Sequence, residues 1–535
     1  MQLVLLLVMD GNFYTDNLRN AKATDEYILK GDRLELFEPH FTFHGFRFVK
    51  LENFPGKPDL NTVTGIVIHS EMPPTGSFVC SDSLINQLQH NIQWGQRDNF
   101  LDIPTDCPQR DERLGWTGDA QVFAPTAAFN FDVAPFFTKW LLDVAADQLP
   151  NGKVPDVIPD VRQGRGSSTA WADVCIIVPW TIYQVYGDKR ILQNQYSSMK
   201  AWVEYMHSRA GDDNLWTGDE HFGDWLAYAS TDSDYPGATT DKDLIATGYY
   251  AYSTGLLAQI AQIIGNTEDA KKYKELASNI KDAFHTEFIT PAGRLVSNTQ
   301  TAYSLALIFG MMPENLITKA AGYLAEDVRK MEHLTTGFVG TPLLCKALSD
   351  NGYDDLAFML LMRKEYPSWL YPVTMGATTI WERWDGQKPD GSFQDVSMNS
   401  FNHYAYGATG QWLYQYVAGI QNDPNIPGYK HIILQPHPGG GLTSALSELK
   451  TGYGTIKSDW KVENGIMNYS CSIPPNSSAT VCFDEIDKQN IVLNDLPILK
   501  NGNAKISQKN QTVKIEVGSG NYIFNLPLKV KNSKP

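Results

Sequence analysis

The pattern of hydrophobic and polar positions changes its period twice along the chain. Residues 1 to about 75 alternate as β-strands do, most clearly at 44–51 and 62–69. The apolar run 3–9 is also interpreted as a strand, because no Lys or Arg precedes it and no signal-peptide cleavage site follows it. The middle of the chain has a helical period, and strand-like alternation returns after Pro424.

The helical part begins with a segment that Ser81 or Ser83 can cap and that carries Leu84, Leu88 and Ile92 at helical spacing. Eleven further helical segments are predicted at 118–129, 133–149, 172–186, 190–209, 241–265, 267–287, 299–310, 313–331, 338–351, 353–365 and 402–420.

Some of these segments are apolar nearly all round and are expected inside, such as 172–186 and 304–312. Others are amphipathic and are expected outside, such as 267–288. Alternating inner and outer helices favour a closed α/α barrel of six hairpins. Its long loops are expected to gather at one end, where function tends to reside, and they are 102–119, 151–171, 211–240 and 366–400.

The C-terminal part has strand-like segments at 431–435, 469–473, 479–483, 513–517 and 522–526. Asn464-Gly465 and Asn501-Gly502 are dipeptides of tight hairpin turns. The pattern therefore predicts a multidomain, mainly α fold: the last part of an N-terminal β-sandwich at 1–75, an (α/α)6 barrel at 76–424 and a C-terminal β-sandwich at 425–535.

The composition limits the classes of molecule that this protein is expected to bind. The net charge is −16 over 535 residues and no long basic run occurs, which argues against nucleic acid or an anionic membrane surface and fits neutral substrates. No segment approaches the roughly 20 apolar residues of a membrane-spanning helix. The six cysteines form no C-x-x-C pair and are expected to be free buried thiols, although Cys471 and Cys482 could pair between neighbouring strands.

The stretch 102–119 reads DIPTDCPQRDERLGWTGD and concentrates charge in a polar loop. Prolines and glycines interrupt it, so it cannot be one solvated helix face. Charges held this close perturb one another's pKa values, which a catalytic acid requires, although a structural ion-pair loop would do the same. From Asp106 onward its charged residues are Asp106, Arg110, Asp111, Glu112, Arg113 and Asp119.

A second acidic centre lies at 379–385, where Glu382 stands between Trp381 and Trp384. A carboxylate flanked by indoles is costly to bury without a purpose, and the alternative is a surface pair with Arg383. Further aromatic, acidic or imidazole candidates are Trp171, Asp224, Trp225 and His403.

Two carboxylates in separate loops of one barrel mouth suit glycoside hydrolysis, in which one protonates the leaving oxygen and the other activates water or attacks carbon. The motifs of serine hydrolases, zinc peptidases and P-loop enzymes are absent from the sequence. The segment 232–237 begins like a calcium loop, but Pro236 occupies a ligand position. No metal and no cofactor is therefore predicted.

Three motifs carry a resemblance to a known family. The segment DCPQRDERLGWTGD from Asp106 resembles the signature of bacterial α-L-rhamnosidases, glycoside hydrolase family 78. IWERW around Glu382 and FNHYAYG around His403 resemble the same family in the expected order, and the resemblance covers about residues 40–535. At the front the sequence departs from the family, because only the end of a preceding β-sandwich domain is expected there, near 41–48.

The resemblance implies an (α/α)6 catalytic barrel and hydrolysis with inversion, with Glu112 as general acid and Glu382 as general base. The expected substrate is a terminal α-L-rhamnoside of a plant glycoside or a rhamnose-rich polysaccharide. The residues that the resemblance places around the sugar are Asp106, Arg110, Trp116, Asp119, Trp171, Trp225 and His403. Asp224 is added from its place beside Trp225, and Trp384 is included beside Glu382.

Two alternatives stay open at this point. One is a different α/α-barrel glycosidase or a polysaccharide lyase, since fold does not fix function. A lyase would need a base near the C5 proton of a uronic acid and a basic groove for its carboxylate. The other is a carbohydrate-binding protein without turnover, although binding alone would not need a pair of catalytic carboxylates.

Overall fold

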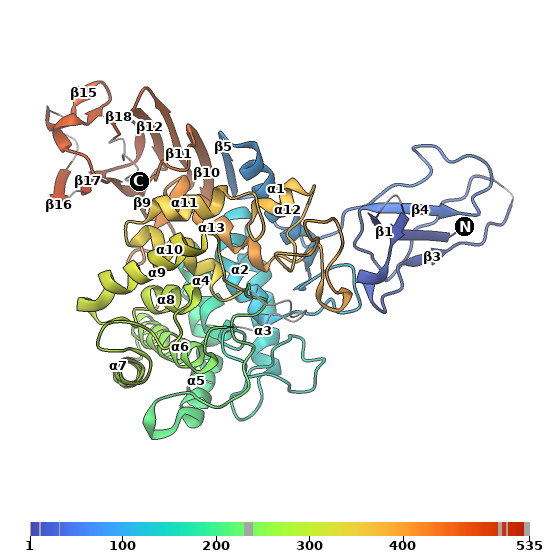
Figure 1. The fold of residues 1–535 in the computed structure, drawn as a ribbon, viewed down its shortest axis with the longest axis horizontal. Helices are drawn as coiled ribbons and strands as arrows, with labels where there is room; N and C mark the ends of the chain where they lie inside the picture. The colour runs from blue at the N-terminus through green and yellow to red at the C-terminus, as the bar shows by residue number, and fades with distance from the viewer. Residues whose placement is uncertain are drawn as a thin grey trace.

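The computed structural model describes residues 2–9, 12–31, 33–228, 239–500, 505–509 and 512–528. Figure 1 shows a large helical body, with the N-terminal strands projecting to its right and the C-terminal sheets at its upper left. The predicted fold class, mainly α with β-structure at both ends, is confirmed.

The helical domain is a closed barrel. Within the described residues, each inner segment contacts the next and the last contacts α2 again. The inner segments are α2 (Thr117–Asn130), α4 (Val174–Tyr186), α6 (Lys242–Ile264), α8 (Gln300–Ile308), α10 (Thr341–Asp350) and a composite of η5 (Ala405–Thr409), α13 (Gly410–Trp412) and η6 (Leu413–Val417).

Outer helices alternate with these inner segments along the chain. They are α1 (Ser83–Asn99), α3 (Ala134–Asp147), α5 (Arg190–Ala210), α7 (Thr267–Phe288), α9 (Ile317–Met331) and α11 (Asp354–Met362). Their sequences explain the layering, since α7 buries Tyr273, Ala277, Ile280 and Phe284 at spacings of four and three residues and exposes its other face. In α2, by contrast, every residue except Pro125 is buried. The predicted alternation of inner and outer helices is confirmed.

The prediction of one continuous helix over 402–420 is wrong. The chain there forms a 3-10 turn, one α-helical turn and a π turn. The cause lies in the neighbouring helix α2, where Oγ1 of Thr126 donates to the carbonyl of Ala408 and accepts from the amide of Gln411, both at 2.9 Å. A side chain of α2 thus replaces helical hydrogen bonds of the last segment.

Short elements complete the loops and turns. One is α12 (Leu370–Thr374), which packs against α1 inside the predicted loop 366–400. The others are η1 (Asp16–Leu18), η2 (Gly211–Asp213), η3 (Glu314–Leu316), η4 (Val396–Met398), η7 (Lys488–Asn490), η8 (Ile498–Lys500) and the hairpin of β6 (Phe100–Leu101) and β7 (Ile103–Pro104).

The N-terminal sheet is antiparallel, and β1 (Gln2–Met9) pairs with β2 (Asn12–Tyr14), β3 (Thr24–Glu26) and β4 (Phe48–Glu52). The strand predicted at 3–9 is confirmed, and the one predicted at 44–51 begins later. The strand predicted at 62–69 is wrong: this segment alternates in sequence but has no pairing strand among the described residues, and a lone segment gains no ladder hydrogen bonds.

The C-terminal part consists of two sheets. The larger has the order β15-β14-β18-β12-β11-β10-β5 and the smaller β16-β17-β13-β9-β8. Their strands are β5 (Gly76–Cys80), β8 (Ile420–Asn422), β9 (His431–Leu434), β10 (Ser444–Thr451), β11 (Gly454–Glu463), β12 (Ile466–Ile473), β13 (Ser478–Phe483), β14 (Val492–Leu493), β15 (Leu496–Pro497), β16 (Lys505–Lys509), β17 (Thr512–Val517) and β18 (Gly520–Pro527).

The two sheets share an apolar core, in which the ring of Phe483 from β13 meets Tyr469 and Phe524 of the larger sheet at 5.8 and 5.3 Å between centroids. The five strands predicted after Pro424 are confirmed. So is the turn at Asn464-Gly465, which joins β11 to β12. The other predicted turn, Asn501-Gly502, lies outside the described residues.

Strand β5 shows how the helical and C-terminal parts interlock. It precedes α1 and falls in the range predicted for the barrel, yet it pairs with β10 at the edge of the larger sheet. The indole Nε1 of Trp460 also donates to the carbonyl of Val417, at the end of the last inner segment, at 2.7 Å. The C-terminal sheets are thereby fixed to the barrel.

All six cysteines are free and buried, so Cys471 and Cys482 do not form the alternative disulfide. Among the helices of the described residues, none combines the length and the apolar character that crossing a lipid bilayer demands.

Candidate active site

One cavity of about 240 Å³ lies where the four predicted long loops meet, so the prediction that they gather at one end is confirmed. This volume is below the roughly 300–1,000 Å³ of clefts that enclose drug-sized ligands. It suits a ligand of about one ring. The residues that line it are Asp106, Arg110, Glu112, Trp116, Asp119, Arg162, Trp171, Phe222, Trp225, Phe338, Glu382, Met398 and His403.

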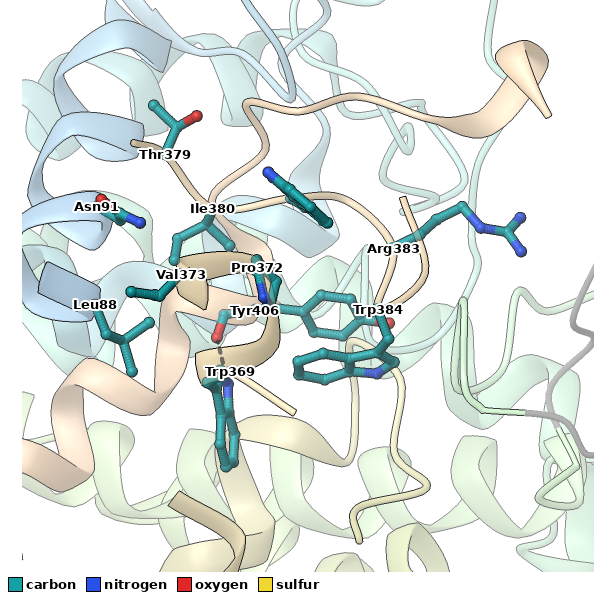
Figure 2. Close-up of a pocket in the computed structure, with 11 residues that line it drawn as sticks. Leu88, Asn91, Trp369, Pro372, Val373, Thr379, Ile380, Arg383, Trp384 and Tyr406 are labelled. Carbon is teal, nitrogen blue, oxygen red and sulfur yellow. Dashed lines mark hydrogen bonds between the residues drawn. The ribbon is translucent and has the colours of Figure 1, made fainter. Parts of the chain in front are cut away.

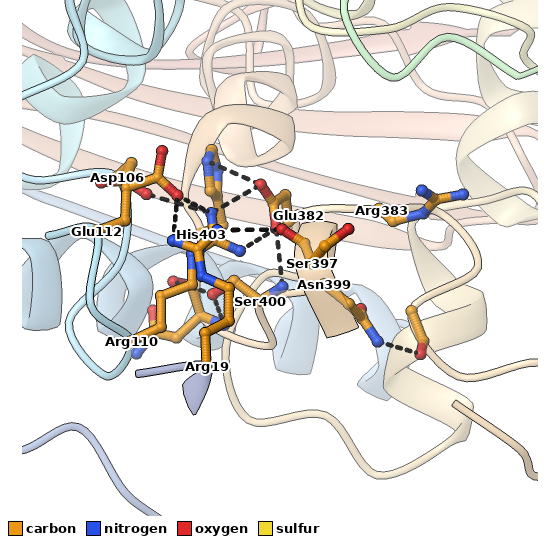
Figure 3. Close-up of polar contacts among 12 residues, drawn as sticks. Arg19, Asp106, Arg110, Glu112, Glu382, Arg383, Ser397, Asn399, Ser400 and His403 are labelled. Carbon is orange, nitrogen blue, oxygen red and sulfur yellow. Dashed lines mark hydrogen bonds and ion pairs between the residues drawn. The ribbon is translucent and has the colours of Figure 1, made fainter. Parts of the chain in front are cut away.

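The guanidinium group of Arg110 lies at the centre of the polar contacts in this cavity (Figure 3). Its Nη1 and Nη2 donate to Oε2 and Oε1 of Glu382 at 2.8 and 3.0 Å. The same Nη2 lies 2.8 Å from Oε2 of Glu112 and 3.4 Å from Oδ2 of Asp106. Only 1 % of the Arg110 side chain is exposed, so these carboxylates compensate a charge that is otherwise costly to bury.

The backbone around Asp106 holds the loop in place. Its amide donates to the carbonyl of Leu114 at 2.9 Å, and its Oδ1 accepts from the amide of Leu114 at 2.8 Å. Arg113 turns the chain in the left-handed region with φ of 46° and donates through Nε to the carbonyl of Arg110 at 3.1 Å. The loop is therefore closed by its own residues, and both Arg110 and Glu112 line the cavity.

Gly118 at the start of α2 is required by close packing. A Cβ atom there would lie 2.4 Å from the indole ring of Trp171, which no side chain tolerates. Glycine thus lets Trp171, from the loop 151–171, lie directly against the first turn of α2 and reach the cavity.

The carboxylate of Glu382 is buried and fully ionised at neutral pH. Burial alone would raise its pKa, but the charges of Arg110 and His403 and the hydrogen bonds from Arg110 and Ser400 lower the pKa of Glu382 to about 2. The amide of Ser400 donates to Oε2 at 2.8 Å, and the Glu382 amide donates back to the Ser400 carbonyl at 2.9 Å. The loop 366–400 thus fixes the orientation of Glu382.

Two further buried groups have shifted pKa values. Burial, and then the negative charge of Glu112, raise the pKa of Asp106 to about 7. Burial would lower the pKa of His403, but the charge and hydrogen bond of Asp119 raise it to about 9. The Nε2 atom of His403 lies 2.9 Å from Oδ1 of Asp119 and 4.0 Å from Oε1 of Glu382. The cavity therefore presents cations and carboxylates side by side.

Aromatic rings form a second wall of the cavity. The ring of Phe222 lies 4.8 Å from Trp171, 5.7 Å from Trp225 and 5.8 Å from Trp116, between centroids. The Trp116 indole Nε1 donates to Oε1 of Glu112 at 2.8 Å, so one ring belongs to both walls.

Four lining residues were not predicted from the sequence: Arg162, Phe222, Phe338 and Met398. The guanidinium of Arg162 lies 4.9 Å from the ring centroid of Trp116. Arg162 and Phe222 lie in two of the predicted loops, and Phe222 directly precedes the Gly223-Asp224-Trp225 segment. For Arg162 and Phe222, proximity to these predicted segments was the signal that could have identified them.

Asp224 lies outside the cavity lining, in contrast to the prediction. It is fully buried, and its carboxylate accepts from the amides of Gly337, Val339 and Gly340 and from the hydroxyl of Thr301. Its carboxylate thus holds the backbone at 337–340, which includes the cavity residue Phe338.

Trp384 also lies outside this cavity. It lines a separate space of only about 10 Å³, where its ring stacks on Tyr406 with centroids 3.9 Å apart (Figure 2). Its Nε1 donates to the carbonyl of Thr336 at 2.9 Å. The other nine predicted site residues all line the cavity.

The described residues contain no group of three or more His, Cys, Asp or Glu side chains arranged to hold a metal ion. The segment 232–237, which begins like a calcium loop in sequence, lies outside the described residues.

Comparison with known proteins assigns all three parts of the chain to one family. Residues 73–417 match the bacterial alpha-L-rhamnosidase 6 hairpin glycosidase domain. Residues 3–69 match the bacterial alpha-L-rhamnosidase concanavalin-like domain, and residues 419–495 match the bacterial alpha-L-rhamnosidase C-terminal domain.

Similar proteins carry the same name. An alpha-L-rhamnosidase of Streptomyces avermitilis is 44% identical over 473 residues, which are 88% of this chain and 45% of that protein. One of Formosa agariphila is 41% identical over 525 residues, 97% of this chain and 56% of that protein. The crystal structure of the Streptomyces avermitilis alpha-L-rhamnosidase complexed with L-rhamnose superposes with a TM-score of 0.91 at 42% identity, covering 98% of this chain and 49% of that one.

The chain thus spans about half the length of the curated relatives it matches. The matched barrel domain alone covers more than half of this chain, and the motifs that suggested the resemblance line its cavity. The chain belongs to the bacterial α-L-rhamnosidase family.

Proposed function

We propose that this chain hydrolyses terminal α-L-rhamnosides, with Glu112 as general acid and Glu382 as general base. The observation that supports this most is the shared contact of both carboxylates with Nη2 of Arg110, at 2.8 and 3.0 Å, although they come from separate loops. Two carboxylates in one cavity are the minimal equipment for cleaving a glycosidic bond.

In the proposed reaction Glu382 accepts a proton from a water molecule whose oxygen attacks the anomeric carbon. Glu112 gives its proton to the glycosidic oxygen, the bond from the anomeric carbon to that oxygen breaks, and the aglycone leaves as an alcohol. A general base must be ionised, and the low pKa of Glu382 keeps it so throughout the neutral range. Direct attack by water inverts the anomeric configuration.

The two walls of the cavity fit the two sides of a 6-deoxy sugar. The ring hydroxyls of rhamnose need hydrogen-bond partners, which Asp106, Asp119 and His403 can offer on the polar wall. The methyl group of rhamnose gains most against apolar surface, which Phe222 and Trp171 provide on the aromatic wall. A hexose carries a hydroxyl group on C6 instead of this methyl group. It would bury that hydroxyl against the aromatic rings without a hydrogen-bond partner.

A panel of nitrophenyl glycosides tests this proposal. We expect release of nitrophenol from the α-L-rhamnoside, and kcat/KM lower by at least about tenfold for the α-L-mannoside, which adds a hydroxyl at the methyl position. Equal rates on both, or turnover only of uronic acid polymers with formation of an unsaturated product, would contradict the proposal.

A further inference from the structure

A turn of the N-terminal domain reaches the catalytic loops. Arg19, which directly follows η1, donates through Nε to Oδ1 of Asp111 at 2.8 Å and through Nη2 to Oε2 of Glu112 at 3.0 Å. Its Nη1 donates to the backbone carbonyl of Ser397 at 3.0 Å (Figure 3). One guanidinium thus joins the segment that carries Glu112 to the loop that carries Glu382.

The turn that presents Arg19 is firmly seated. Asn17 and Leu18 are 2 % and 4 % exposed, and Asn20 donates through Nδ2 to Oδ2 of Asp111 at 3.1 Å. Burial opposes ionisation of Asp111, yet the charge and hydrogen bond of Arg19 lower the pKa of Asp111 below its usual value. Two neighbouring residues of the turn therefore contact the same carboxylate.

The backbone of Arg19 is unusual for a residue with a side chain. Its φ of 56° and ψ of −115° lie outside the regions that L-residues normally populate. Such a conformation is strained and persists only where the surrounding structure maintains it. At Arg19 this conformation coincides with the contacts of the guanidinium with Asp111, Glu112 and Ser397.

We propose that Arg19 is a positioning residue for the general acid, through which the N-terminal β-domain orients Glu112 toward the glycosidic oxygen. This inference rests on the proposed role of Glu112. Oε2 of Glu112 has contacts with Arg110 and Arg19, while Oε1 accepts from Trp116. These partners come from the loop itself and from a separate domain, so the rotamer of the acid depends on both.

The alignment of two domains then becomes a condition for proton donation. Ser397 belongs to η4, and the next residue, Met398, lines the cavity. A displacement of the N-terminal turn would move Arg19 away from the acid and from η4 together. Glu382 would keep its own contacts with Arg110 and Ser400, because Arg19 does not touch them.

The dependence of kcat/KM on the leaving group separates a positioning role of Arg19 from general support of the fold. Departure of dinitrophenolate needs little protonation, whereas departure of an unactivated phenol needs the acid. We expect Arg19→Gln to lower kcat/KM for phenyl α-L-rhamnoside about tenfold or more, part of the 10²–10⁴-fold that a positioned acid contributes, and to lower it far less for the dinitrophenyl compound. Arg19→Lys should recover part of the loss.

Arg47 supplies a matched control. It also spans from the N-terminal domain to the barrel, where its Nη1 donates to the carbonyl of Gly376 at 3.2 Å, but it forms no ion pair with a carboxylate of the described residues. Arg47→Gln should leave the ratio of the two rates unchanged. Melting temperatures of all variants show whether each is folded, and Arg19→Lys decides the question if Arg19→Gln does not fold.

The outcomes distinguish failure of the positioning role of Arg19 from failure of the proposed role of Glu112 as general acid. The positioning role is overturned if Arg19→Gln lowers kcat/KM equally for both substrates or leaves it at the wild-type value. In that case Glu112→Gln still shows the large leaving-group dependence of an acid. If the wild type cleaves both substrates but Glu112→Gln shows no such dependence, the proposed acid itself is wrong and the inference falls with it.

Discussion

The surroundings of Glu382 and Glu112 differ in how they are built. Glu382 is 3 % exposed and takes its contacts from Arg110, Ser400 and His403, all within the barrel domain. Glu112 is 18 % exposed and is held in part by Arg19, from the N-terminal domain. The proposed base is thus fixed inside one domain, while the proposed acid lies at a junction of two. Each turnover leaves the acid without its proton and the base with one, so both must exchange a proton with solvent, and Glu112 is the more exposed of the two.

The largest expected effect is loss of either carboxylate. Glu382→Gln should lower kcat by 10²-fold or more on every rhamnoside, because water then lacks a base whatever group departs. Glu112→Gln should be as severe on unactivated substrates and much milder on the dinitrophenyl one. Steady-state kinetics with both substrates measure this, and circular dichroism confirms that the variants are folded. If both variants lost the same activity on both substrates, Glu112 and Glu382 would not have the different roles proposed for them.

Arg110→Met should have the next largest effect, on stability. It leaves Glu382 buried without its bidentate partner, and breaking such a pair costs about 3–5 kcal/mol. In the wild type the pKa of Glu382 is lowered from 4.5 to about 2, so the pair contributes stability that is complete above pH 4.5 and is lost as the pH falls toward 2. Denaturant titrations between these pH values should show this loss in the wild type and not in the variant.

Trp116→Phe tests the surroundings of Glu112, with a smaller expected effect. It keeps an aromatic ring but removes the Nε1 donor to Glu112, and a hydrogen bond contributes about 0.5–1.5 kcal/mol, or roughly twofold to tenfold in kcat/KM. Trp384→Phe is the control, since its Nε1 donates to the carbonyl of Thr336 outside the cavity. If both variants lose activity equally, the Trp116 contact has no special part in catalysis.

The smallest expected effect concerns the pH dependence of His403. The pKa of His403 is raised from 6.5 to about 9 by its pair with Asp119, so this pair's stability is complete below pH 6.5 and lost as the pH rises through 9. His403→Gln should therefore melt below the wild type at pH 6.5, and the gap should close by about pH 10. A gap that stays constant with pH would show that His403 is neutral in the folded protein.

The sequence predicted the residues whose local context is distinctive. Glu112 and Glu382 lie in segments where charges occur beside prolines, glycines or tryptophans, and such segments rarely form solvated helix faces. The barrel was predictable because fully apolar and amphipathic helices alternate, and this alternation reports directly on burial.

Other features depend on contacts that no local pattern contains. Arg19 is 93 residues from Glu112 in sequence and lies in a different domain. Asp224 and Trp225 are adjacent, yet only Trp225 lines the cavity, because adjacency does not determine side-chain direction in an irregular loop. The break in the last inner helix likewise results from Thr126, which lies in another helix.

The proposed reaction requires Glu112 and Glu382 to act together on one bond, with a water molecule between Glu382 and the anomeric carbon. Proton NMR of the sugar released in the first seconds of hydrolysis tests this directly. We expect β-L-rhamnose to form first and then to mutarotate, because water attacks from the face opposite the leaving group. Initial formation of α-L-rhamnose would mean that a carboxylate attacks carbon, and would contradict the assignment of Glu382 as a general base.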